Sequence, residues 1–200
     1  MSSSDHSLLF NEKQGLIDMP SGTHRVKYLA GEEWDFYVDT PQHKTVDLSL
    51  VLPHFRARNQ PIEERISMFV GAESAPMKLK VCRSVFRSKF ELEVRASTSD
   101  VIVYLPSDFK GVIHCHKSAK SLKFSDGFVN RIMANVRLND HASIDDDEVV
   151  VATAGSVTFR MWDCATNAPE CTQKEALKRL FGCSRKAPET SHDWDFLLED

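Results

Sequence analysis

The sequence predicts an all-β protein: a stacked β-sandwich or short β-solenoid-like domain with one C-terminal α-helix. Three observations lead to this fold class. Several short segments alternate apolar and polar residues, which is the pattern of a strand that buries one face. Gly, Pro, Ser and Asp interrupt these segments at short intervals, as expected for strands joined by turns. Two segments also look like copies of one strand-turn-strand unit.

The predicted strands follow one another along the first 163 residues. Four of them have apolar residues at every second position, within residues 46–52, 77–81, 90–96 and 157–161. Each is expected to bury one face and expose the other. Residues 101–106 are apolar at nearly every position, so we expect that strand to be covered on both sides.

The possible repeat pairs "LEVRASTSDVIVYLP" (residues 92–106) with "VVVATAGSVTFRMWD" (residues 149–163). Both have a strand, then Ala with Ser, Thr or Gly, then a second apolar strand. Stacked units of this kind build β-solenoids and some sandwiches. Two copies alone leave both architectures open.

The chain divides into a loose N-terminal tail (1–24), a β-rich domain (25–183) and an acidic, aromatic C-terminal tail (184–200). The predicted helix closes the domain at residues 172–182, because Thr172 and Glu175 form a capping box and Gly182 follows an apolar stripe at helical spacing. Residues 127–138 fit either a helix or a strand, and their strand neighbours favour a strand.

The composition excludes some classes of function. The net charge of -4 and the absence of a basic arm argue against a nucleic-acid partner. No apolar run approaches the roughly 20 residues that span a bilayer. The N-terminus does not resemble a secretory signal, so we expect the five cysteines to be free thiols of a cytoplasmic protein.

The stretch "GVIHCHKSAK" (residues 111–120) carries the most reactive side chains. On a strand, His114 and His116 share a face and lie about 7 Å apart, so both could bind one divalent transition metal. A third ligand would have to come from another strand, and nearby lysines oppose a cation. Cys115 points to the opposite face, which argues against a Cys-His nucleophile.

Two further groups are candidates for binding. Asn130 and Arg131 carry an amide and a guanidinium that could read a polar ligand. The C-terminal tail carries Trp194, Phe196 and Leu197 among acids, as in short linear motifs that dock on a partner. The alternative for this tail is that it folds back onto its own domain.

A chain of motifs within residues 101–140 resembles an uncharacterised β-rich domain family of fungal proteins, found especially in mushroom-forming fungi. The matching residues are Leu105-Pro106, Phe109, Gly111, His114, Phe124-Ser125, Gly127-Phe128 and Asn130-Arg131-Ile132. The similarity covers roughly residues 40–163. It implies a stacked β-sheet architecture akin to adhesin-like domains, and it implies no activity. It supports His114 more than His116.

The sequence therefore predicts a non-catalytic binding or protein-interaction module that acts through His114, Asn130 and Arg131 or through the acidic tail. The partner, a protein or a small molecule, is not identified. One alternative is a metal-dependent, cupin-like enzyme with His114 and His116 as ligands. A second alternative is a self-assembling structural protein, because β-arcs stack and their edges pair. Whether the chain is an enzyme stays open.

Overall fold

The computed structural model describes residues 21–40, 44–84 and 88–171, and it confirms the all-β class. The elements in chain order are β1 (Ser21–Arg25), β2 (Phe36–Thr40), β3 (Val46–Val51), β4 (Ile66–Ala72), β5 (Met77–Cys82), β6 (Phe90–Ala96), β7 (Val101–Pro106), β8 (Gly111–Cys115), β9 (Ser121–Phe124), α1 (Asp126–Arg131), the 3-10 helix η2 (Met133–Asn135), β10 (Val136–Leu138), β11 (Asp147–Ala152), β12 (Ser156–Asp163) and β13 (Ala168–Pro169).

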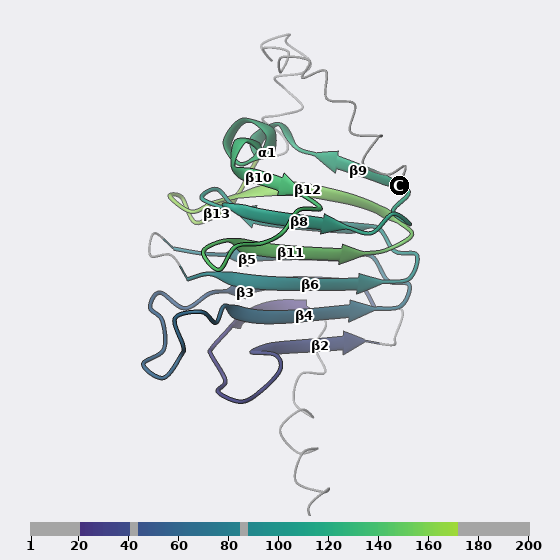
Figure 1. Ribbon diagram of the computed structural model, residues 1–200. Coiled ribbons are helices and arrows are strands. Elements are labelled where there is room, and N and C mark those ends of the chain that lie inside the picture. Colours follow the sequence, from purple (N-terminus) through teal and green to yellow (C-terminus); the bar gives the residue numbers. More distant parts are fainter. Residues whose placement is uncertain (1–20, 41–43, 85–87, 172–200) are drawn as a thin grey trace, which may run out of the picture.

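The strands form two sheets that face each other (Figure 1). Sheet A has the order β1-β3-β5-β7-β12, with β9 and β13 also paired to β12, and sheet B has the order β2-β4-β6-β11-β8-β10. All pairs are parallel except β12 with β13. From β2 to β9 consecutive strands alternate between the sheets. The chain therefore winds in successive coils, which is the solenoid form of the two predicted architectures.

The core lies between the sheets and consists of the inward residues of every coil. The predicted alternation is confirmed: Val46, Leu48 and Leu50 on β3 are fully buried, and the apolar positions of β5, β6 and β12 join the same cluster. On β7, the outward Tyr104 is only 7% exposed. It packs beside Cys82 and Trp162 in a small second cluster, so neighbouring outward side chains cover that side of the strand.

The last coil is inserted between two earlier ones. Strand β11 pairs with β6 on one side and β8 on the other, and β12 likewise lies between β7 and β9. The two similar segments of the sequence thus stack as neighbouring coils, with Val149 beside Leu92 and Val157 beside Val101. We call β11 and β12 together the β11–β12 arc.

The connection from β10 to β11, residues 139–146, must cross β8, because these two strands pair with opposite edges of β8. The core fills the inner side of sheet B, so this crossing loop runs over its outer side (Figure 1). Val112 points outward on β8 and is nevertheless fully buried, as expected beneath a crossing chain. The side chain of Arg137 bonds to that of Asp146, and the backbone N–H of Cys115 donates to Asn139 Oδ1.

The prediction of a strand over residues 127–138 is wrong for most of that segment. Residues 126–131 form α1, η2 follows, and only the last three residues form β10. Ser125 caps α1 by accepting a hydrogen bond from the backbone N–H of Phe128. Phe128 and Ile132 are fully buried, and their spacing of four places both on one helix face. The cap and this spacing decide for the helix.

Three predicted segments, the N-terminal tail, the C-terminal helix and the acidic tail, lie partly or wholly outside the described residues. The C-terminal helix at 172–182 and the acidic tail at 184–200 are outside them. At the other end, β1 begins at Ser21, four residues before the predicted domain boundary, and pairs with β3 from Ser21 to Arg25. The side chains of this polar segment do not alternate, so the sequence did not predict a strand here. Hydrogen bonds between the backbones of β1 and β3 form it instead.

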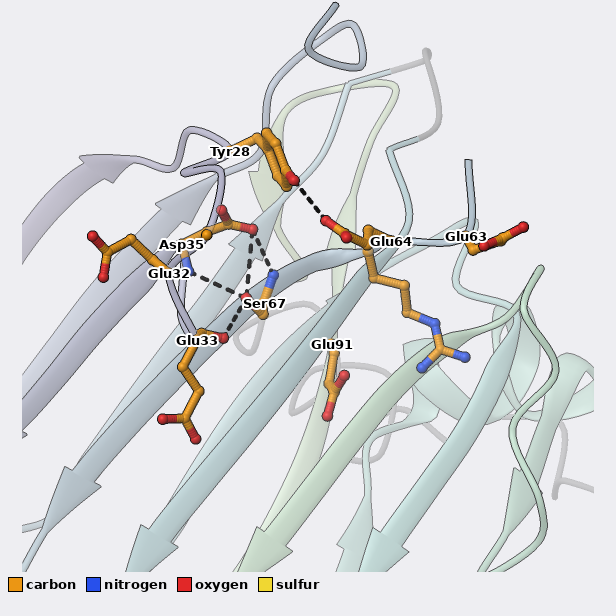
Figure 2. Close-up of a pocket in the computed structure, with 10 residues that line it drawn as sticks. Tyr28, Glu32, Glu33, Asp35, Glu63, Glu64, Ser67 and Glu91 are labelled. Carbon is orange, nitrogen blue, oxygen red and sulfur yellow. Dashed lines mark hydrogen bonds between the residues drawn. The ribbon is translucent and has the colours of Figure 1, made fainter. Parts of the chain in front are cut away.

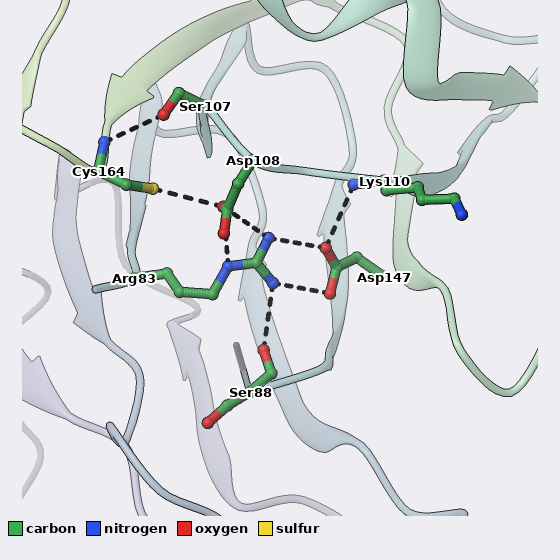
Figure 3. Close-up of polar contacts among 7 residues, drawn as sticks. All are labelled: Arg83, Ser88, Ser107, Asp108, Lys110, Asp147 and Cys164. Carbon is green, nitrogen blue, oxygen red and sulfur yellow. Dashed lines mark hydrogen bonds and ion pairs between the residues drawn. The ribbon is translucent and has the colours of Figure 1, made fainter. Parts of the chain in front are cut away.

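A buried charged cluster ties the β11–β12 arc to the rest of the domain (Figure 3). The Arg83 guanidinium, which has no exposed side-chain area, donates to both carboxylate oxygens of the equally buried Asp147 at 2.9 Å. It also donates to Asp108 Oδ1 and to the carbonyl oxygen of Ser88. Burial alone would lower the pKa of Arg83, but Asp147 and Asp108 outweigh it and raise that pKa. We refer to Arg83, Asp108 and Asp147 as the arginine clasp.

Candidate functional site

The outer face of sheet B presents polar side chains in rows that cross the strands. Ser67, Glu91 and Glu148 occupy paired positions on β4, β6 and β11. His114 on β8 stands beside Val150, which pairs with Glu93. Paired positions on parallel strands lie about 4.8 Å apart. The parallel register therefore brings together carboxylates that are 57 residues apart in the sequence, Glu91 and Glu148.

A pocket of about 640 Å³ opens at one end of these rows. The loops before β2 and before β4 form its walls, and the first outward positions of β4 and β6 form its floor. Figure 2 shows the side chains around it. The lining residues are Tyr28, Gly31, Glu32, Glu33, Asp35, Glu63, Glu64, Arg65, Ser67 and Glu91; we call this the acidic pocket.

Asp35 holds the wall of the pocket in place. Its carboxylate accepts hydrogen bonds from the backbone N–H groups of Leu29 and Ser67. Its own backbone N–H donates to the carbonyl oxygen of Ser67. Across the opening, the Tyr28 hydroxyl donates to Glu64 Oε2 at 2.6 Å. Two separate loops are thereby fixed relative to β4, so the pocket is formed before any ligand arrives.

The charges of the acidic pocket are poorly balanced. Six of its ten lining residues carry carboxylates and one carries a guanidinium. That guanidinium, on Arg65, bonds to Glu148 and to the carbonyl oxygen of Ser143 in the crossing loop. Burial raises the pKa of Asp35, with a further contribution from Glu64. Burial and the neighbouring Glu148 raise the pKa of Glu91 despite the opposing effect of Arg65.

The raised pKa values of Asp35 and Glu91 mean that ionisation of these two side chains opposes folding. An acid whose pKa is higher in the folded than in the unfolded chain costs stability once the pH rises above its unfolded pKa. Asp35 and Glu91 therefore lower stability near neutral pH, and protonation at lower pH relieves the cost. A bound cation would relieve it at neutral pH.

His114 and His116 both lie on the outer side of sheet B, but they have different surroundings. His114 Nε2 stands 3.3 Å from Glu148 Oε1, and its side chain is 33% exposed. Through Glu148 it connects to Arg65 at the edge of the acidic pocket. His116 is exposed, and its Nδ1 bonds to the Ser118 hydroxyl. Each histidine thus has its own polar partner.

The metal hypothesis for His114 and His116 stays a prediction. Within residues 21–40, 44–84 and 88–171, no three or more His, Cys, Asp or Glu side chains gather in a way that could hold a metal ion. The third ligand that the hypothesis requires is therefore not among the described side chains.

Cys115 belongs to the core rather than to the outer face. Burial raises the pKa of its thiol to about 12, and burial raises the pKa of the Cys82 thiol to about 11. At pH 8 the thiolate fraction of Cys115 is then on the order of one in ten thousand. A thiol that stays protonated is a poor nucleophile.

We expect the cysteines to differ strongly in alkylation by iodoacetamide at pH 8. Cys171 is exposed and should react within minutes, whereas Cys115 and Cys82 should react only as the protein unfolds. Peptide mass spectrometry over a time course would measure this, with a sample in denaturant as the control in which all react. Rapid labelling of Cys115 in the folded protein would contradict its assignment to the core.

Asn130 and Arg131 lie on α1, away from the row that carries His114. The Asn130 amide donates to the carbonyl oxygen of Asp126 in the same helix, and Arg131 is exposed at the helix end. None of the described contacts joins these two residues to His114. The motif of Trp194, Phe196 and Leu197 lies outside the described residues. The role of both groups in binding stays a prediction.

Sequence reasoning missed the acidic pocket. Its acids come mainly from "GEEWD" (residues 31–35) and "EER" (residues 63–65). Charged runs in turns are usually solvated, so neither stretch stood out. The usable signal was that both stretches directly precede strands. Only the structure shows that those strands, β2 and β4, are neighbours in one sheet.

The fold and the site define a short parallel β-solenoid with a polar outer face and a preformed acidic pocket. Residues 37–143 match the model of a domain of unknown function, DUF7330. The chain therefore belongs to the DUF7330 family. Comparisons with curated proteins and with solved structures found no match. No helix among the described residues has the length and apolar character needed to cross a membrane.

Proposed function

We propose that this chain is a non-catalytic binding module whose acidic pocket takes a cationic segment of a protein partner. The observation that carries the proposal is the charge imbalance of a preformed pocket: six carboxylates surround it, and Arg65 is engaged elsewhere. A ligand with Lys or Arg side chains would supply the missing positive charge.

The loops that wall the acidic pocket favour a peptide over a small polyamine. Leu29, which follows the lining residue Tyr28, is 47% exposed, and Ile62, which precedes the lining residue Glu63, is 84% exposed. Large apolar side chains beside an acidic opening fit a partner whose cations are flanked by apolar residues. The fungal source and the cytoplasmic location stay predictions from the sequence, and this proposal does not depend on either of them.

The proposal is tested with the peptide acetyl-Leu-Lys-Leu-Lys-Leu-amide, and with its Glu-for-Lys counterpart as the control ligand. The Lys peptide should shift the backbone NMR signals of Ser67 and Glu91. The double variant Glu32→Gln/Glu33→Gln should weaken its binding about two- to thirtyfold, because exposed charges each contribute about 0.2–1 kcal/mol. Binding should also weaken as the pH falls through the raised pKa values of Asp35 and Glu91.

The matched control is Glu73→Gln/Asp145→Asn, which changes the net charge equally at exposed positions outside the acidic pocket. This control should bind the Lys peptide like the unmodified chain. Equal losses in both double variants would mean that net charge alone attracts the peptide, and the proposed site would be wrong. NMR shifts confined to another face would have the same meaning.

A further inference from the structure

The β11–β12 arc fills one strand position in each sheet, so removing it would open a gap with the shape of a β-arc. Without the β11–β12 arc, strands β6 and β8 of sheet B would face each other across one missing strand, and so would β7 and β9 of sheet A. Four strand edges would then expose unpaired backbone groups, which cost free energy unless a partner strand satisfies them.

The β11–β12 arc is joined to the earlier coils by a single connection. That connection is the crossing loop, residues 139–146, most of which is exposed. After β12 only β13 follows among the described elements, and it pairs with β12 itself. As far as the described residues go, the arc could therefore leave its place through a change in the path of the crossing loop. An arc of the same sequence from another chain would make the same contacts within the gap.

We propose that the gap also accepts the β11–β12 arc of a second copy of this chain, so that two copies fold together by exchanging arcs. The arc bonds to its neighbours through the Arg83–Asp147 pair of the arginine clasp and through Arg65 with Glu148. The Thr153 hydroxyl, between β11 and β12, also donates to the carbonyl oxygen of Ser99. All of these bonds join the arc to other coils, so an exchanged arc forms every one of them between copies. The gap adjoins the acidic pocket, because Arg65 and Glu91 line the pocket and both also neighbour Glu148 of the arc.

The length of the crossing loop decides whether the arc fills the gap of its own chain or the gap of a second copy. Leu138 pairs with Ile113 and Asp147 pairs with Gly111, so the loop ends are two strand spacings and two residues apart, about 12 Å in a straight line. The loop must also rise over β8 and descend again. Eight residues span this path easily, whereas three residues reach about 14 Å when fully extended, which is too short to pass over β8.

The first test shortens the crossing loop in the full chain by deleting residues 140–144, which leaves three residues between β10 and β11. We expect a dimer of twice the 22.7 kDa chain mass by light scattering, with the circular dichroism of the unmodified chain. A variant with five Gly and Ser residues inserted after Ala142 is the control and should stay monomeric. A shortened variant that is monomeric and folded would overturn the proposal.

The second test does not depend on the shortened variant folding. Glu93 and Val150 are paired neighbours on β6 and β11, at a spacing that a disulfide can bridge. Chains carrying Glu93→Cys alone and Val150→Cys alone are unfolded, mixed, refolded together at high concentration and oxidised. Mass spectrometry should find the two introduced thiols joined between chains.

The matched control pair for cross-linking is Glu93→Cys with Lys123→Cys, since Lys123 is exposed on the outer side of sheet A. This pair should give no comparable product. If the Glu93→Cys and Val150→Cys chains cross-link no more than the control pair, the arcs do not exchange and the proposal is wrong. That result would hold even if the shortened variant had failed to fold.

Discussion

Replacing Arg83 by Met should lower the free energy of unfolding by about 3–5 kcal/mol, the usual cost of removing one partner of a buried ion pair. The side chains of Arg83 and Asp147 have no exposed area. Within the described part of the chain, the substitution would leave the buried Asp147 carboxylate with the backbone N–H of Lys110, at 3.4 Å, as its remaining hydrogen-bond donor. Urea unfolding followed by tryptophan fluorescence would measure the change.

The partner positions of the arginine clasp provide two controls. Asp108→Asn should cost less than about 1 kcal/mol, because the Asp108 side chain is 37% exposed and water can replace its contact with Arg83. The double variant Arg83→Met/Asp147→Leu should recover part of the loss, since an apolar pair of similar volume often replaces a buried ion pair without cost. If the double variant is no more stable than Arg83→Met, the unpaired charge of Asp147 is not the cause of the lost stability.

The sequence allowed the fold class and the buried faces to be predicted, because alternation is a local property. Leu48 and Leu79 could be placed in the core from their own segments. The place of β11 between β6 and β8 could not be predicted, since alternation shows which side of a strand is buried and gives no information about its neighbours. The similarity of residues 92–106 and 149–163 suggested that the two segments stack. It did not indicate that β8 would lie on the other side of β11.

The acidic pocket was not predicted for a related reason. Its lining comes from three stretches of chain, around Glu32, Glu64 and Glu91, which the parallel register brings to one end of sheet B. His114 was singled out because another histidine, His116, lies two positions later in the sequence. The structure instead pairs it with Glu148, 34 residues later. Local spacing shows which residues share a strand face, whereas a site across several strands depends on their order in the sheet.

Replacing Gly111 by Ala should destabilise the domain by about 3 kcal/mol or more, at or above the upper end of the range for overpacking. Gly111 begins β8 and pairs with Asp147 on β11 and Val136 on β10. An added Cβ would lie 1.8 Å from the carbonyl oxygen of Asp147 and 2.7 Å from its backbone nitrogen. Backbone atoms cannot move aside as the end of a side chain can, so β8 and β11 would have to separate.

That separation would carry Asp147 away from Arg83, so the steric cost and the loss of the arginine clasp would add together. Gly127→Ala is the matched control: the atoms nearest its Cβ are side-chain ends, of Glu170 at 2.1 Å and of Met161 at 3.4 Å, and Ala favours the helical conformation of α1 more than Gly does. Hydrogen exchange should accelerate at the Asp147 amide, which donates to the carbonyl oxygen of Lys110. Unchanged stability and exchange in Gly111→Ala would show that β8 and β11 do not pack this closely, and both the clasp and the inserted arc would need to be reconsidered.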